Sequence, residues 1–169
     1  MRGQLLIKRG DVVAGVLCSR TALDELREIG LVLNRSELLV ALAHGLAGIG
    51  QVAEGLEAID DALAQCERTD ERWNMAELLR VKGELLVLEG TPEASVTAEN
   101  HYQHALDLAR RQGALWWELR AATSLARLWR DQHRVEEARE LLARVYARFT
   151  EGFATRDLQE TKTLLGQLA

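Results

Sequence analysis

The sequence predicts an all-α protein, a right-handed α-solenoid of about four helix pairs followed by a C-terminal capping helix. Three observations lead to this prediction. Leucine, alanine, glutamate and arginine, which are strong helix formers, dominate the 169 residues, and no run of alternating β-branched residues indicates a strand. Glycines and capping residues divide the chain into segments of helix length. Small residues recur about every 40 positions, as they do in stacked helical units.

Nine helices are expected, each bounded by a start or a stop signal. Glycine readily adopts the left-handed conformation that follows a helix, whereas Ser, Thr, Asp and Pro favour helix starts. The expected stops are Gly10, Gly30, Gly50, Gly90, Gly113 and Gly152. The expected starts are Asp11, Ser36, Asp70, Thr91 and Thr155. The expected helices span 2–9, 11–29, 36–49, 51–68, 71–89, 93–112, 115–132, 135–151 and 156–168.

An internal repeat is the strongest signal in the chain. Two antiparallel helices approach most closely where their side chains are smallest, so small residues at a fixed step predict repeated helix–helix contacts. Three such series advance in steps of 40 or 43: Gly3, Ala43, Gly83 and Ala126; Gly15, Gly55, Ala98 and Ala138; Ala22, Ala62, Ala105 and Val145. We therefore expect one repeat domain over 1–169, with units of approximately 1–30, 31–70, 71–113 and 114–153 and a cap over 154–169.

This pattern resembles the tetratricopeptide repeat (TPR). The resemblance rests on the Leu-Ala pairs that end at Ala43 and Ala126, and on the spacing of Ala98, Tyr102 and Ala105. The period of 40–43 is longer than the period usual for this repeat, because the expected helices are longer. HEAT repeats have periods near 40 but lack this series of small residues, so a TPR-like solenoid is the preferred interpretation.

A second resemblance covers most of residues 50–169. The segments 66–73, 76–86, 109–113, 117–129 and 145–153 are similar to the C-terminal repeat region of bacterial class III adenylate cyclase/ATPase-type multidomain regulators. The resemblance implies a regulatory or sensor array in bacterial signalling or transcription regulation. The cyclase and ATPase residues of such proteins are not among these segments.

Composition and charge exclude several classes of function. The formal net charge is −5 and the pI about 5.5, whereas nucleic acid binding calls for a positive face. The longest run without a charge, 38–53, is short for a membrane span. Cys18 and Cys66 lie in leucine- and alanine-rich segments, where free cysteine acts as a small hydrophobe. We expect a cytoplasmic protein with reduced thiols and neither nucleic acid nor membrane partners.

No motif supports catalysis, a cofactor or a metal. Residues 48–53 have the shape of a dinucleotide-binding turn, but residues 38–47 before them lack the required strand pattern. His101 and His104 stand beside Glu99 on an expected helix, short of the three or four ligands of a zinc site. We therefore predict no enzyme activity, no cofactor and no metal ligand. Three convergent titratable side chains in one pocket would be needed to favour an enzyme.

A groove along the first helices of the units is the predicted functional site. In TPR arrays these helices line the concave face. If Ala43, Gly83 and Ala126 face the second helix of their pair, fixed offsets from them predict the groove positions. The apolar ones are Val40, Ala47 and Val87. The polar ones are Glu37, His44, Glu77, Arg80, Glu84, Arg120, Thr123, Arg127 and Arg130.

The charges in this groove allow two interpretations. Glu77–Arg120 and Glu84–Arg127 would be ion pairs between units, and solvated pairs of this kind stabilise a fold weakly. Alternatively, arginines at 80, 127 and 130 would present bidentate donors to a carboxylate or another anion. The four tryptophans are similarly ambiguous. They would pack between helices or anchor a partner: Trp73, Trp116, Trp117 and Trp129.

The sequence thus favours a non-catalytic TPR-like scaffold that binds a protein or peptide partner. The alternative is a small-molecule effector-sensing domain of a multidomain ATPase/cyclase regulator, which a deep pocket around Trp73 and Trp116 would favour. Leu5, Leu6 and Ile7 would meet no preceding unit. We therefore expect either a piece of a longer array or a homodimer that hides this N-terminal edge.

Overall fold

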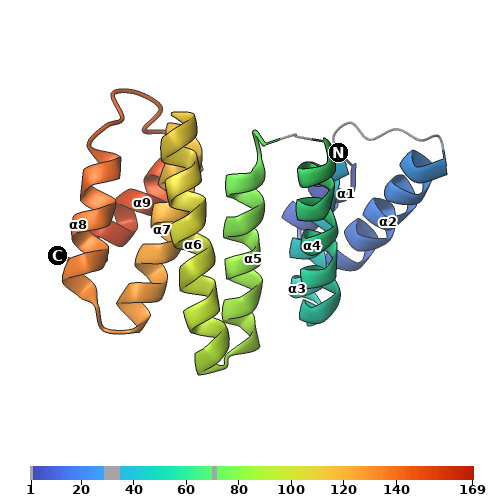
Figure 1. Cartoon of the computed structure of the whole chain (residues 1–169), viewed down its shortest axis with the longest axis horizontal. Coiled ribbons are helices and arrows are strands. Elements are labelled where there is room, and N and C mark those ends of the chain that lie inside the picture. Colours follow the sequence, from blue (N-terminus) through green and yellow to red (C-terminus); the bar gives the residue numbers. More distant parts are fainter. Residues whose placement is uncertain (1, 29–34, 70–71) are drawn as a thin grey trace.

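A computed structural model describes residues 2–28, 35–69 and 72–169, which form nine α-helices and no strand (Figure 1). Gly30 and Asp70, an expected stop and an expected start, lie outside these ranges. Among the described residues, no helix is long and apolar enough to cross a membrane. The helices are α1 (Arg2–Lys8), α2 (Val12–Glu28), α3 (Arg35–Gly48), α4 (Val52–Thr69), α5 (Met75–Glu89), α6 (Pro92–Gln112), α7 (Leu115–Asp131), α8 (Val135–Tyr146) and α9 (Arg156–Gln167).

The helices form an all-α solenoid in two layers. Each helix packs against the next one in the chain, and successive odd-numbered helices, from α1 to α9, also pack against one another. Figure 1 shows the resulting row, with α1 and α2 near one end and α8 and α9 at the other. The odd-numbered helices, which are the first helices of the predicted units, therefore make a continuous inner layer.

Most of the described helix ends agree with the local signals. All five described stop glycines have positive φ angles of 64–90°, and Gly90 and Gly113 are C-cap residues in the left-handed region. At the start of α6, the hydroxyl of Thr91 accepts a hydrogen bond from the Ala94 N–H at 3.1 Å, and Pro92 occupies the first turn. These are the capping roles that the sequence predicts for threonine, proline and glycine.

Two predicted boundaries were wrong, and tertiary contacts lie beside both. The helix expected to begin at residue 71, which is outside the described residues, begins at Met75, and the buried Asn74 side chain before it donates to the Ser36 hydroxyl at 2.6 Å. The helix expected to end at 151 ends at Tyr146. After this helix, Arg148 pairs with buried Glu118 at 2.5 Å. The rings of Phe149 and Trp116 pack in a T-shaped arrangement, with their centroids 5.7 Å apart.

The small residues lie where paired helices meet. A Cβ added to Gly3 would stand 2.8 Å from the Gly15 carbonyl oxygen, and one added to Gly55 would stand 3.2 Å from the carbonyl oxygen of Ala43. In the third pair, a Cβ on Gly83 would stand 2.5 Å from the Tyr102 ring. In each of the first two units, the residue of the first series thus lies against the residue of the second series. These contacts explain why the two residues stand equally far apart along the chain in both units.

The apolar core follows the same architecture. One cluster of buried residues joins α2 to α5 and a second joins α5 to α9, so α5 contributes to both. The expected N-terminal edge is less open than predicted. Leu5 is 56% exposed, but Leu6 and Ile7 are half-buried, and Ile7 packs against Gly15 and Gly45. Ile7 thus contacts α2, in its own helix pair, and α3, in the next pair. Of the three residues, Leu5 is the exposed one.

Candidate functional site

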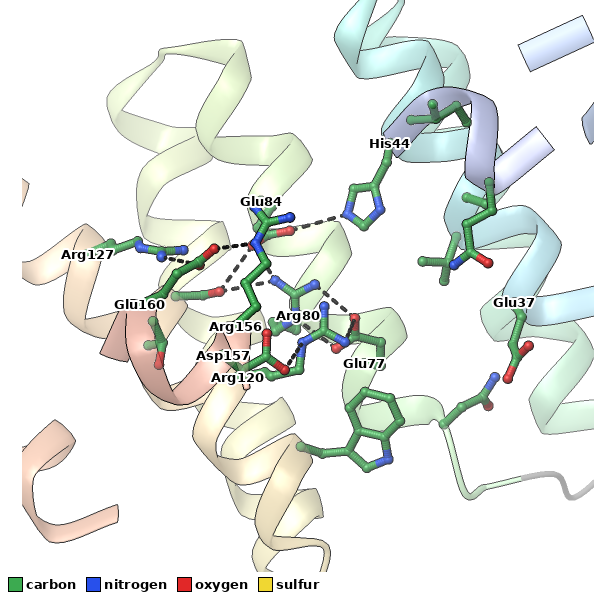
Figure 2. A pocket seen from close by; sticks show the side chains of 18 of the residues that line it. Glu37, His44, Glu77, Arg80, Glu84, Arg120, Arg127, Arg156, Asp157 and Glu160 are labelled. Carbon is green, nitrogen blue, oxygen red and sulfur yellow. Dashed lines mark hydrogen bonds and ion pairs between the residues drawn. The ribbon is translucent and has the colours of Figure 1, made fainter. Parts of the chain in front are cut away.

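A groove of about 710 Å³ runs across the odd-numbered helices (Figure 2). Eight of the nine polar residues predicted for the groove line it: Glu37, His44, Glu77, Arg80, Glu84, Arg120, Thr123 and Arg127. Arg130 lines an adjoining cavity of about 270 Å³, which shares Arg127, Arg156 and Glu160 with the groove. Of the three apolar positions predicted by the same offsets, Val40 lines the groove, whereas Ala47 and Val87 do not.

Arg80 stands at the centre of the groove floor and is only 4% exposed. Its Nε and Nη2 donate to the two oxygens of Glu77 at 2.8 and 2.9 Å, and its Nη1 bonds to Glu84 and to the Ser124 hydroxyl. Burial opposes the charge, but the hydrogen bonds and negative charges of both glutamates outweigh it and raise the Arg80 pKa. Because its N–H groups are engaged by these partners, Arg80 is placed to organise the groove rather than to present donors to a ligand.

Ion pairs extend from Arg80 to the neighbouring units. His44 Nε2 lies 3.4 Å from Glu84 Oε2, which joins α3 to α5. Arg120 Nη1 lies 2.8 Å from Glu77 Oε1, which joins α7 to α5 and confirms the predicted Glu77–Arg120 pair. Arg120 Nε also lies 3.9 Å from Asp157 Oδ2, which joins α7 to α9. One chain of charges therefore crosses four successive first helices.

The predicted pair Glu84–Arg127 was wrong. Glu84 turns to Arg80 and His44, whereas Arg127 Nη2 donates to Glu160 Oε2 at 2.9 Å. Arg80, which is buried on the same helix as Glu84, pairs with the Glu84 carboxylate, and Glu160 on α9 is the partner of Arg127.

We expect the Glu84 carboxylate to make stability depend on pH. Burial opposes its ionisation, but the hydrogen bond from His44 and the charge of Arg80 outweigh burial and lower the pKa to about 2. The unfolded chain, with a glutamate pKa of about 4.3, then binds more protons, so Glu84 stabilises the fold above about pH 4.5 and loses this effect as the pH falls towards 2. In urea titrations, Glu84→Gln should be less stable than wild type at pH 6, with the difference vanishing near pH 2. A pH-independent difference would contradict this account.

The C-terminal end of the groove is rich in arginine. Glu160 on α9 accepts from Arg156 Nε at 2.6 Å and from Arg127 at its other oxygen. These two hydrogen bonds lower the Glu160 pKa. Arg130 pairs with Asp131 at 2.8 Å and donates to Gln167 Oε1 at 3.1 Å.

The contribution of α9 to the groove was not predicted from the sequence. Arg156, Asp157 and Glu160 line the groove, although the sequence indicated only a polar cap. A signal was present in the repeat itself. Gly166 continues the first series of small residues by one step beyond Ala126, and the offset of six before it selects Glu160. The capping helix thus occupies the place of a fifth first helix.

The tryptophans divide between the two predicted roles. Trp73, 50% exposed, and Trp117, half-buried, line the groove. Trp116 instead packs edge-on against Phe149 and donates from Nε1 to Asp157, and Trp129 donates to Glu99 at 2.7 Å. The pocket around Trp73 and Trp116 that would favour an effector sensor is not formed, because the second tryptophan at the groove is Trp117.

Two central groups of the groove, Glu84 and Arg80, have pKa values shifted away from neutrality. A general acid or base works best with a pKa near the working pH. Here the pKa of Glu84 is lowered to about 2 and that of Arg80 is raised, so both groups stay charged near neutrality. Within the described ranges, no cluster of three or more His, Cys, Asp or Glu side chains could hold a metal ion. The arrangement is suited to binding by charge and hydrogen bonds.

Comparisons with known proteins agree with this architecture. No family model matches the chain, and no curated protein matches it. Among solved structures, a putative kinesin light chain with nearly identical TPR-like repeats from Podosopora anserina matches with a TM-score of 0.70 and 17% identity. A variant of that protein with one substitution matches with a TM-score of 0.71 and 17% identity. Each alignment covers 98% of this chain and 81% of the other. The chain therefore has a TPR-like helical-repeat fold.

Proposed function

We propose that the groove binds an extended segment of a partner protein and that the chain acts as a non-catalytic TPR-like scaffold. One observation carries this proposal. Four successive first helices, α3, α5, α7 and α9, present side chains to a single groove whose floor is held in place by the Arg80 ion-pair chain. A rigid polar groove of this kind can hold a peptide with little loss of its own conformational freedom.

The two ends of the groove offer different chemistry. Glu37 and the half-exposed ring of Trp73 stand at the α3–α5 end, and Arg127 and Arg156 stand at the α7–α9 end. Tryptophan and arginine are the residues most often found at interaction hot spots. A bound segment would therefore place an apolar or basic residue at one end and an acidic residue at the other.

Peptide selection tests this proposal directly. Peptides from a random dodecapeptide library, enriched on the wild-type chain, should lose about tenfold or more in affinity for Arg127→Glu and for Trp73→Ser, as hot-spot truncations do. Arg144→Glu is the matched control, because Arg144 is an exposed arginine on α8, paired with Glu140 and absent from the groove lining. Melting temperatures should stay equal to those of wild type. Enriched peptides that bind all three variants equally would refute the groove as the binding site.

We further propose a regulatory setting for this scaffold, in a cytoplasmic protein of bacterial signalling or transcription regulation. The resemblance of residues 50–169 to the repeat region of class III adenylate cyclase/ATPase-type regulators supports it. The neighbouring coding sequence is the test. An ATPase or cyclase module encoded next to this chain would support the proposal, and its absence from the neighbourhood would count against it.

A small-molecule effector is the second candidate ligand. The groove volume of about 710 Å³ falls within the range of small-molecule sites, roughly 300–1,000 Å³, and Trp73 and Trp117 line it. A thermal-shift screen of metabolites, with quenching of tryptophan fluorescence as a second readout, distinguishes the two functions. A metabolite that stabilises wild type but not Trp117→Ala would favour the sensor, whereas binding only to peptides would favour the scaffold.

We also propose that the chain forms a homodimer through its N-terminal helix pair. Exposed apolar residues support this, since Leu5 is 56% exposed and Val13 and Leu17, four residues apart on α2, are each 60% exposed. Wild type should show a dimer mass by light scattering at micromolar concentration, and Leu17→Lys should shift it to the monomer. A monomer mass for wild type at this concentration would contradict the proposal.

A further inference from the structure

We propose that Arg127 and Arg156 form a carboxylate subsite at the α7–α9 end of the groove, which Glu160 fills until an acidic residue of the partner displaces it. This inference rests on the proposed scaffold function and assigns a ligand chemistry to one end of the groove. It also assigns a binding role to α9.

The contacts of Glu160 already have the form of carboxylate recognition. Oε1 accepts from Arg156 Nε at 2.6 Å, and Oε2 accepts from Arg127 Nη2 at 2.9 Å, so each oxygen meets a different guanidinium. Figure 2 shows these side chains converging from α7 and α9. Charge-assisted bonds of this type are the strong ones that proteins use to bind carboxylates. The carboxylate of Glu160 thus marks where a ligand carboxylate would sit.

This internal occupant is weakly held. Arg156 is 85% exposed at its side chain, Arg127 42% and Glu160 36%, and ion pairs this open to water stabilise a fold little. Each arginine uses one nitrogen against Glu160, and in the described part of the chain no further partner meets the remaining N–H groups of either guanidinium. Arg80, by contrast, is buried and held by three partners. Exchange of the bound carboxylate is therefore possible at Arg127 and Arg156 but not at Arg80.

The charge of the surroundings favours an acidic ligand. Three arginines line the cavity that adjoins the groove, Arg127, Arg130 and Arg156, and Glu160 is the acidic residue among its lining side chains. Arg130 is paired with Asp131, so with Glu160 in place this group of side chains still carries an excess of positive charge. The ligand that fits is a glutamate or aspartate side chain of the bound segment.

The test measures how a capped hexaglutamate peptide, labelled with fluorescein, binds by fluorescence anisotropy at low salt. Glu160→Gln should tighten binding about 3–10-fold, because removing an internal competitor raises the fraction of competent sites. Arg156→Gln and Arg127→Gln should each weaken binding about 2–5-fold, as expected when an ion pair this open to water is lost. A hexaglutamine peptide should not bind to any variant.

A matched pair on α8 controls for net charge. Glu140 and Arg144 form the same kind of i, i+4 ion pair, with exposed side chains outside the groove lining. Glu140→Gln changes the net charge as Glu160→Gln does, so equal tightening by both would overturn the inference, as would undiminished binding to Arg156→Gln. If either of these results is found but library peptides still lose affinity for Trp73→Ser, the inference fails and the scaffold function is retained. Library peptides that bind Arg127→Glu and Trp73→Ser as tightly as wild type, with the Glu160 effect on hexaglutamate intact, would instead refute the extended groove site and leave the carboxylate subsite.

Discussion

Replacing Arg80 with methionine should lower the free energy of unfolding by about 3–5 kcal/mol, the cost expected when one partner of a buried ion pair is removed. The substitution leaves Glu77, which is 7% exposed, and Glu84 without the guanidinium that both contact. It also breaks the connection between the His44 and Arg120 ends of the charge chain. Urea denaturation followed by far-UV circular dichroism at pH 7 measures the effect.

Two controls separate the loss of a buried partner from the loss of an arginine. Arg144→Met, at an exposed ion pair on α8, should change stability by less than about 1 kcal/mol. The triple variant Glu77→Gln, Arg80→Met, Glu84→Gln should recover part of the loss, because it removes the buried charges together. An Arg80→Met variant that unfolds within about 1 kcal/mol of wild type would show that the groove floor does not depend on this network.

Gly83→Ala should destabilise the fold, by about 1–3 kcal/mol. The added Cβ would stand 2.5 Å from Cε1 and 2.8 Å from Cδ1 of the Tyr102 ring, which is 3% exposed and cannot swing into solvent. Alanine otherwise favours a helix over glycine by about 1 kcal/mol, so a net loss of stability would report the clash between α5 and α6. Thermal and urea unfolding measure it.

The same substitution at Gly166 is the matched control. Gly166 lies within α9, and a Cβ built there would meet nothing within 4 Å. Gly166→Ala should therefore stabilise the fold, by about 0.5–1 kcal/mol. In addition, Tyr102→Leu should offset part of the Gly83→Ala loss in a double-mutant cycle, as expected for two groups in direct contact. Equal effects at the two glycines would contradict the role assigned to close packing.

Local chemistry explains how much of the fold could be predicted from the sequence. A glycine after an apolar stretch, as at Gly90 and Gly113, ends a helix because few other residues adopt its left-handed conformation. The regular step between small residues predicts which helices touch, because only small side chains allow such an approach. Offsets from Ala43, Gly83 and Ala126 then select one face of each first helix. Eight of the nine polar groove residues follow from this periodicity alone.

The tertiary structure decided which of these side chains meet. The repeat spacing places Glu84 on α5 and Arg127 on α7 at one surface. It does not determine that Arg80 pairs with Glu84 or that α9 brings Glu160 to Arg127. Long charged side chains have several rotamers, and their partners depend on the position of each helix in the stack.

The sequence by itself therefore determined the helices, their repeat and the face that becomes the groove, since these depend on backbone conformation and side-chain size at fixed spacing. The three-dimensional packing alone decided that Trp117 rather than Trp116 lines the groove, and that the Glu160 carboxylate on the last helix meets Arg127. Both outcomes depend on helix position and side-chain direction across the stack, which no local pattern encodes.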